Sequence, residues 1–128
     1  MTNPISSYLG VHATALPLRE QRMQLIASNL SNADTPNYKA QDLEFQSVLE
    51  NAVRQTAPGA SQTERVPGTL DLAAQIFERP GVQPSLDGNT VDADTERAAY
   101  GRAALEYRAS LSFIESKVRT MLTAITGQ

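Results

Sequence analysis

The sequence predicts a mainly α-helical, elongated protein whose N- and C-terminal helices pair as in a coiled coil, with an irregular central arm between them. Three observations support this fold class. An apolar-striped segment ends near residue 32, a heptad apolar pattern begins near residue 100, and a Pro-, Gly-, Thr- and Gln-rich stretch separates them. We expect an N-terminal helical region over 1–53, an arm over 54–90 and a long helix over 91–126, with both ends forming one structural domain.

The N-terminal segment allows two interpretations because of Pro17. Residues 1–16 have helix-compatible apolar spacing, but proline lacks an N–H and kinks or breaks a helix interior. Either Pro17 lies in the first turn of a helix over about 17–32, which we favour, or one longer helix is kinked there. A stripe of apolar residues follows, flanked by Leu18 and Leu25: Met23, Ile26, Ala27 and Leu30. Asn32 is expected to cap this helix in the left-handed conformation.

A turn motif and a short helix are expected next. The turn motif is Asp34-Thr35-Pro36-Asn37-Tyr38. Pro36 fixes φ at the second position of a type II turn, and Asn37 tolerates the positive φ that the third position needs. Apolar residues then recur at helical intervals, which predicts a short helix over 45–53 with Asp42 near its start.

The arm and the C-terminal helix have contrasting patterns. Residues 56–90 hold four of the seven Pro and four of the seven Gly, so we expect a long loop with one possible helical turn near 70–78. From Val91 a helix begins, which Asn89 or Thr90 can cap. Carboxylates that favour the helix dipole occupy its first turns: Asp92, Asp94 and Glu96. We call the segment around this helix start the helix-entry motif: Asp87-Gly88-Asn89-Thr90-Val91-Asp92.

A heptad pattern defines what we call the apolar seam of this helix. Its members alternate at intervals of four and three: Tyr100, Ala104, Tyr107, Leu111, Ile114, Val118, Met121 and Ile125. Gly127 should end the helix. At about 1.5 Å per residue the helix is roughly 50 Å long, which is too long for a small globular core to cover.

Small, uncharged residues lie on the helix away from the seam. They include Ala109, Ser112, Phe113, Ser116, Thr120 and Thr123. An ordinary, weakly polar surface is one explanation. We favour packing against neighbouring subunits, because an outward Phe113 among small side chains suits contact better than solvent.

Composition excludes several classes of protein. At 128 residues with 41% apolar content, no Trp and few other aromatic residues, the chain forms at most one lean domain. A net charge of −3 without a basic stripe argues against nucleic-acid binding, and the absence of Cys excludes disulfides. No apolar run approaches the roughly 18–20 residues that cross a bilayer. The first eighteen residues hold no Lys or Arg and no apolar core, so a cleaved secretory signal is not expected.

No catalytic, cofactor or metal site is predicted. His12 is the only histidine and no Cys accompanies it, which excludes a triad or a zinc site. Asp87 to Ala98 resembles a calcium loop superficially, but Asp92 stands where the loop needs Gly and Ala98 where it needs Glu. Phosphate-binding glycine motifs are absent.

Two stretches resemble a known family. Residues 25–39, which contain Asn29-Leu30-Ser31-Asn32-Ala33 and the turn motif, resemble the N-terminal signature of bacterial flagellar rod, hook and filament-junction proteins. Residues 83–92, which contain the helix-entry motif, resemble the proximal-rod branch more narrowly. Asn37 replaces the common Gly of the turn, and Tyr107-Arg108-Ala109-Ser110 lacks an Asn that other rod and hook proteins often show, which favours the proximal-rod branch.

The resemblance implies a structural subunit of the flagellar rod, whose terminal helices pair and polymerise into a hollow helical tube. It implies export through the flagellar type III apparatus without a cleaved signal, a place in the periplasmic rod, and a role in transmitting torque around the export channel. Expected partners are copies of itself, other rod subunits, membrane-ring or rod adaptor proteins and the export apparatus. The expected subunit-interface residues are Met23, Ile26, Leu30, Tyr100, Tyr107, Leu111, Phe113, Ile114, Ser116, Val118, Met121 and Ile125.

Two alternative functions remain open from the sequence. One is another axial subunit of the rod and hook family. The other is a soluble coiled-coil adaptor or chaperone, which would form a defined dimer where a rod subunit would form filaments at high concentration. An enzyme is a distant third, since no site chemistry supports it.

Overall fold

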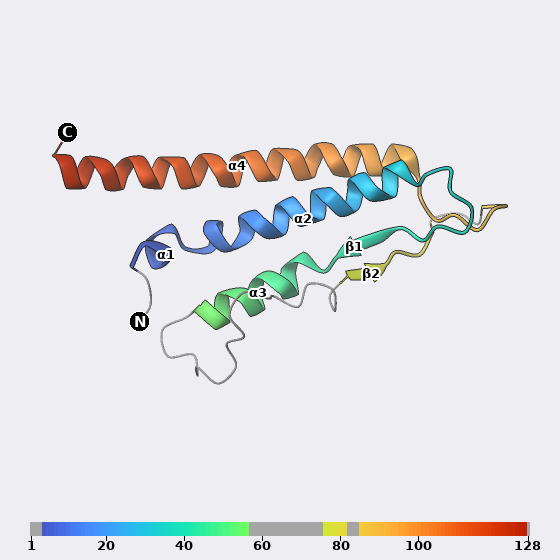
Figure 1. The fold of residues 1–128 in the computed structure, drawn as a ribbon, viewed down its shortest axis with the longest axis horizontal. Coiled ribbons are helices and arrows are strands. Elements are labelled where there is room, and N and C mark those ends of the chain that lie inside the picture. The colour runs from blue at the N-terminus through green and yellow to red at the C-terminus, as the bar shows by residue number, and fades with distance from the viewer. Residues whose placement is uncertain (1–3, 57–75, 82–84, 128) are drawn as a thin grey trace.

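The computed structural model describes residues 4–56, 76–81 and 85–127. It is elongated and mainly helical, which confirms the predicted fold class (Figure 1). The elements in chain order are α1 (Pro4–Leu9), α2 (Val11–Ser31), β1 (Gln41–Leu43), α3 (Phe45–Thr56), β2 (Ile76–Glu78) and α4 (Ala93–Thr126). None of the helices in the described part of the chain is both long and apolar enough to span a membrane.

Pro17 lies inside α2, so the favoured interpretation of a helix beginning at Pro17 is wrong and the longer helix is found. The break falls instead at Gly10, whose φ of 63° separates α1 from α2. Proline removes only one backbone hydrogen bond, and its fixed φ suits a helix. Burial of Ala15 and Leu18 on either side of it holds this turn in place, so tertiary packing outweighs the local preference.

Helix α2 is the middle of three layers. It contacts α4 on one side, and β1 and α3 on the other (Figure 1). The second contact encloses a small apolar core of Leu18, Leu43 and Val48, with Leu25, Phe45, Leu49 and Ile76 packed around it. Burying one such aliphatic side chain contributes about 1.5–3 kcal/mol. A helix that packs on two sides has no single apolar stripe, which is why Leu18 and Leu25 lie outside the predicted one.

A strand pair that the sequence pattern did not predict joins the N-terminal region to the central arm. Strands β1 and β2 are antiparallel, with Gln41 opposite Glu78 and Leu43 opposite Ile76. Asp42 precedes α3 by three residues, near its start as predicted, but it lies in the middle of β1, which the pattern did not indicate. The suggested helical turn near 70–78 lies largely outside the described residues, and its last three residues form β2 instead.

The helix ends depart in part from expectation. Asn32 is the C-cap of α2, but its φ of −102° is not left-handed, and its side chain donates to the Ser28 carbonyl oxygen at 2.8 Å. The N-cap of α4 is Asp92 rather than Asn89 or Thr90. Gly127 ends α4 in the left-handed conformation with φ 72°, as predicted.

Helix α2 runs antiparallel to α4, and α1 contacts the same helix (Figure 1). Arg19 Nη1 lies 2.8 Å from Glu106 Oε2. Closer to the N-terminus of α2, the rings of His12 and Phe113 stack with centroids 4.9 Å apart. Further along, Lys117 Nζ donates to the Tyr8 carbonyl oxygen at 3.0 Å. The intervals along the two sides are equal from contact to contact, so these three contacts share one register across the break at Gly10.

Candidate functional site

The turn motif and the helix-entry motif, distant in sequence, form one interlocked junction. Asn89, only 6% exposed, is its centre. Its Nδ2 lies within 2.9 Å of three carbonyl oxygens at the end of α2 and the start of the turn, those of Asn32, Ala33 and Thr35. Its Oδ1 accepts the backbone N–H of Val91 at 2.8 Å. One side chain thus ties the C-terminal end of α2 to the entry of α4.

Backbone bonds extend this junction along both motifs. The Asn37 N–H donates to the Asp87 carbonyl oxygen at 2.8 Å, and the Thr90 N–H donates to the Tyr38 carbonyl oxygen at 3.0 Å. The Tyr38 N–H donates to the Thr35 carbonyl oxygen at 3.3 Å, which closes the predicted turn. Asn37 has φ 60°, so the predicted positive φ is confirmed.

Carboxylates at both ends of the helix-entry motif hold local structure. Asp92 Oδ1 accepts the N–H groups of Asp94 and Thr95, and its Oδ2 accepts the Thr95 hydroxyl at 3.0 Å. These bonds, the Thr95 hydroxyl first, lower the pKa of Asp92 from its ordinary 3.8. The N–H of Asn89, followed by the Ser85 hydroxyl, lowers the pKa of Asp87 in the same way.

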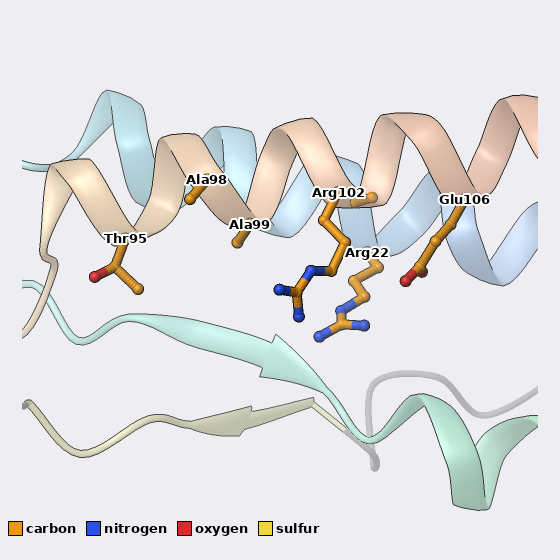
Figure 2. A pocket seen from close by; sticks show the side chains of 7 residues that line it. Arg22, Thr95, Ala98, Ala99, Arg102 and Glu106 are labelled. Carbon is orange, nitrogen blue, oxygen red and sulfur yellow. The ribbon is translucent and has the colours of Figure 1, made fainter.

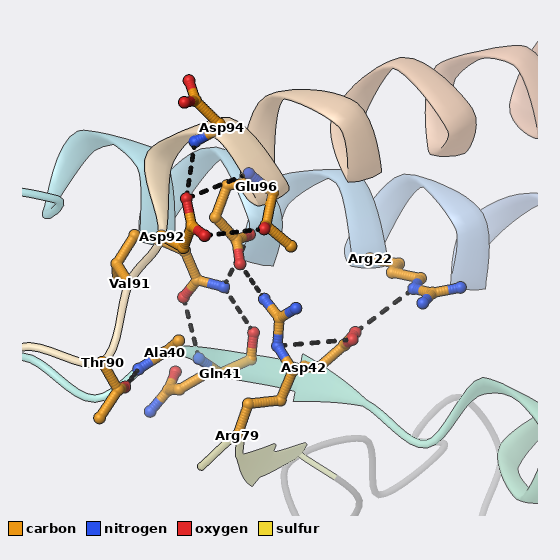
Figure 3. A network of polar contacts seen from close by, with 12 residues as sticks. Arg22, Ala40, Gln41, Asp42, Arg79, Thr90, Val91, Asp92, Asp94 and Glu96 are labelled. Carbon is orange, nitrogen blue, oxygen red and sulfur yellow. Dashed lines mark hydrogen bonds and ion pairs between the residues drawn. The ribbon is translucent and has the colours of Figure 1, made fainter. Parts of the chain in front are cut away.

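A buried polar network fills the layer between α2, the strand pair and α4 (Figure 3). Asn29 is fully buried: its Nδ2 donates to the Gln41 carbonyl oxygen at 2.7 Å and to Glu96 Oε2 at 3.3 Å. Its Oδ1 accepts the Gln41 N–H at 2.9 Å and the Tyr38 hydroxyl at 3.2 Å. The Asn29 side chain therefore forms hydrogen bonds both with the backbone of β1 and with Glu96 of α4.

Charged side chains continue the same network. Glu96 is 2% exposed and forms an ion pair with Arg79, the residue that follows β2. Arg79 Nε also lies 3.9 Å from Asp42 Oδ2, and Arg22 Nε donates to Asp42 Oδ1 at 3.3 Å. The network joins α2, β1, β2 and α4, so it fixes the arm to the helix pair.

Sequence reasoning missed this network. Glu96 looked like a carboxylate placed for the helix dipole, and Arg79 stood in a Pro- and Gly-rich stretch without periodicity. An acidic residue at the start of a helix has the same sequence signature whether it faces solvent or an arginine. The pairing depends on β2, which the sequence pattern did not indicate.

The face that α4 turns to α2 is offset from the apolar seam. The buried residues of α4 are Glu96, Ala103 and Ser110, whose small or polar side chains let α2 approach closely. One row of the seam lies at the edge of this contact and is half-buried: Tyr107, Ile114 and Met121. The other row is open, with Leu111 36%, Val118 41% and Ile125 75% exposed.

The other expected interface residues divide between interior and surface. Ile26 is 1% exposed and lies inside the chain's own fold. Met23 and Leu30 are half-buried. Tyr100, Phe113 and Ser116 are exposed, although Phe113 stacks on His12. The open row of the seam and the small-residue face thus form a long surface of α4 that is exposed in the single chain.

Comparison with known proteins identifies the family. The family model for the flagella basal body rod protein matches residues 9–39, which span α2 and the turn motif. Flagellar basal body rod protein FlgB of Aeromonas hydrophila is 39% identical over 122 residues, covering 93% of this chain and 92% of that protein. The chain belongs to the FlgB family of flagellar basal body rod proteins. FlgB of Cereibacter sphaeroides (37%, with 94% of both chains covered) and of Escherichia coli K12 (34%, covering 98% and 97%) agree.

Membership of this rod protein family makes the chain a structural component of the flagellar basal body, and not an enzyme. The similarity to FlgB spans nearly the whole chain, so it includes the helix-entry motif and α4 as well as the region that the family model matches. Both motifs of the interlocked junction therefore belong to one rod-protein fold. No cluster of His, Asp or Glu within the described residues could hold a metal ion.

Proposed function

We propose that this chain is a subunit of the proximal rod, which polymerises with copies of itself and with other rod subunits through the open surface of α4. The observation that carries the proposal is the exposed row of the apolar seam. Leu111, Val118 and Ile125 recur every seven residues along a helix whose α2-facing side lies elsewhere. Aliphatic side chains that are exposed along one side of a helix suit contact with a neighbouring subunit.

The rest of the proposal concerns location and partners. The subunit is exported through the flagellar type III apparatus without a cleaved signal and takes its place in the periplasm. There it contacts membrane-ring or rod adaptor proteins and contributes to a hollow tube that transmits torque around the export channel. Both ends of the chain form one domain, and the arm, fixed by Arg79, extends from it.

Imaging of basal bodies tests this proposal. Cells that lack the chain should build no complete rod, and the wild-type chain should restore both the rod and swimming. A purified chain that forms filaments with rising concentration supports the proposal. A chain that stays a defined dimer at every concentration, and leaves the rod unchanged when deleted, would instead be a coiled-coil adaptor.

A further inference from the structure

A groove beside α4 is lined by apolar and cationic side chains (Figure 2). Its volume is about 300 Å³, and its lining residues are Arg22, Thr95, Ala98, Ala99, Arg102, Ala103 and Glu106. The three alanines supply the apolar part of the lining. Figure 2 shows the Arg22 and Arg102 side chains extending from their two helices into the same space.

Of the charged side chains that line this groove, some form ion pairs and one does not. Glu106 is held by Arg19 at 2.8 Å, and Arg22 uses its Nε for Asp42. No ion pair joins Arg102 to any other residue in the described ranges 4–56, 76–81 and 85–127. The groove therefore offers an apolar wall beside an unpaired guanidinium group, and it suits a ligand that is aliphatic on one side and anionic on the other.

The same chain has an exposed turn that combines an aliphatic and an anionic side chain. Leu86 is exposed to the full extent of an isolated residue, the highest exposure among the large apolar residues described, and Asp87 follows it with a solvent-exposed carboxylate. Two hydrogen bonds close the turn that presents them: the Gly88 N–H donates to the Ser85 carbonyl oxygen at 3.3 Å, and Asp87 Oδ1 accepts the Asn89 N–H at 3.1 Å. A preorganised projection loses little conformational freedom when it binds.

We propose that the Leu86-Asp87 turn of one copy inserts into the Arg102 groove of a second copy, with Leu86 against Ala98 and Ala99 and Asp87 against Arg102. Because Leu86 is fully exposed, the turn does not fill the groove of its own chain. A contact between two different surfaces of identical chains is heterologous, and repeating it generates an open helical filament rather than a closed dimer. This inference rests on the proposed rod assembly and names one of its contacts.

Disulfide trapping tests the contact, because the chain has no Cys of its own. Leu86→Cys and Ala98→Cys chains are produced together in cells that lack the wild-type chain, and basal bodies are isolated, oxidised and separated without reductant. A bridge needs Cα atoms within about 7 Å, so a crosslinked heterodimer is expected only if the turn enters the groove. The control pairs Leu86→Cys with Asn51→Cys, an exposed position on α3.

Two outcomes overturn the inference. One is a yield for Leu86→Cys with Ala98→Cys no higher than for the Asn51→Cys control. The other is an unchanged yield when Arg102→Glu is added to the groove chain, which should weaken the association roughly tenfold, or by about 1.4 kcal/mol. If cysteine variants impair rods, the purified full-length chains are crosslinked at high concentration with the same criteria. Normal rods without the crosslink refute only this contact, whereas wild-type chains that build no rod refute the proposed function.

Discussion

Gly88 lies directly against the side chain of Asn37, in a backbone conformation that favours glycine. A Cβ atom added at Gly88 would lie 2.5 Å from Asn37 Oδ1, and Gly88 has φ +74°. Asn37 itself has φ 60°. Two residues with left-handed backbone, 51 positions apart in the sequence, thus meet where the segment that follows α2 lies beside the segment that precedes α4.

Gly88→Ala should destabilise the chain, because it adds both backbone strain and this steric clash. The strain alone costs about 1–2 kcal/mol in the left-handed region. Gly101→Ala is the matched control, since Gly101 lies in α4 with no heavy atom within 4 Å of its added Cβ. That substitution should stabilise α4 by about 0.5–1 kcal/mol. Urea unfolding followed by circular dichroism measures both, and equal midpoints for the two variants would contradict the geometry.

Substitutions at Asn37 test the same junction from the other side. Asn37→Gly should be tolerated, because glycine adopts positive φ without strain, whereas Asn37→Val should lose stability and swimming. A β-branched residue is a genuine outlier at that φ. Spreading in soft agar gives the functional readout. Equal spreading of the two variants would show that the junction does not depend on this backbone geometry.

The buried pair of Arg79 and Glu96 should contribute far more than an exposed pair on the same helix. Arg79→Ala leaves the Glu96 carboxylate uncompensated at 2% exposure, and the loss of one partner of a buried pair costs about 3–5 kcal/mol. Arg97→Ala removes an exposed pair with Asp94 and should cost less than about 0.5 kcal/mol.

Glu96→Gln added to Arg79→Ala distinguishes charge burial from lost packing. The neutral amide removes the buried charge, and its carbonyl oxygen can still accept from Asn29, so part of the lost stability should return. The free energy of unfolding of the double variant decides the question. A double variant no more stable than Arg79→Ala would mean that lost packing explains the cost.

The sequence predicted those features that depend on local or regular patterns. Pro36 with Asn37 indicated the turn, and the heptad intervals indicated α4, because each signal lies within a few neighbouring residues. The unpredicted features depend on contacts between distant segments. Asn89 was expected to cap a helix, yet its amide binds the carbonyl oxygens of Asn32, Ala33 and Thr35. Strand β2 exists only because β1 lies beside it.

The offset between the seam and the buried face of α4 has a similar cause. Ala103 and Ser110 are not recognised as core residues by an apolar pattern, yet their small side chains let α2 pack closely. Apolar periodicity finds the large side chains of a helix. It does not distinguish side chains that face the chain's own core from side chains that face a neighbouring subunit. Leu111 and Val118 were therefore assigned to the seam, but the sequence did not indicate which helix packs against them.

Acid should weaken the start of α4 through Asp92. The bonds from Thr95 and Asp94 lower the pKa of this carboxyl below 3.8 in the folded chain, so its contribution to stability is complete above about pH 3.8 and is lost as pH falls through the folded-state pKa. Asp92→Asn keeps a capping side chain without the titration, and its helicity should fall less on acidification than that of the wild type. Circular dichroism from neutral pH to about pH 2 measures this, and identical acid profiles would assign the loss to other carboxylates.

Leu111→Asp should separate assembly from folding. Leu111 is 36% exposed in the single chain, so an aspartate there can reach water and should lower the unfolding midpoint much less than a charge placed in the buried face of α4. In an assembled rod the same charge would be buried without a partner, at a cost of several kcal/mol, so rods should not form. The proposed export handles an unfolded chain, so under that proposal the variant should still be exported. Ser110→Asp provides the contrasting variant. Ser110 is only 3% exposed and lies on the buried face of α4, so an aspartate there should destabilise the single chain itself.

Ser116→Lys decides whether the small-residue face of α4 also takes part. Ser116 is exposed in the single chain, so lysine should leave the monomer stable, and Ser112→Ala on the same surface should change little under any hypothesis. If a neighbouring subunit packs against this face, the long cationic side chain prevents close approach, and rod growth should fall, though less completely than with Leu111→Asp. Electron microscopy of basal bodies from each strain measures rod length and number. Normal rods with Ser116→Lys would show that this face remains in solvent, and the proposed assembly would then depend on the seam and on the groove around Arg102 alone.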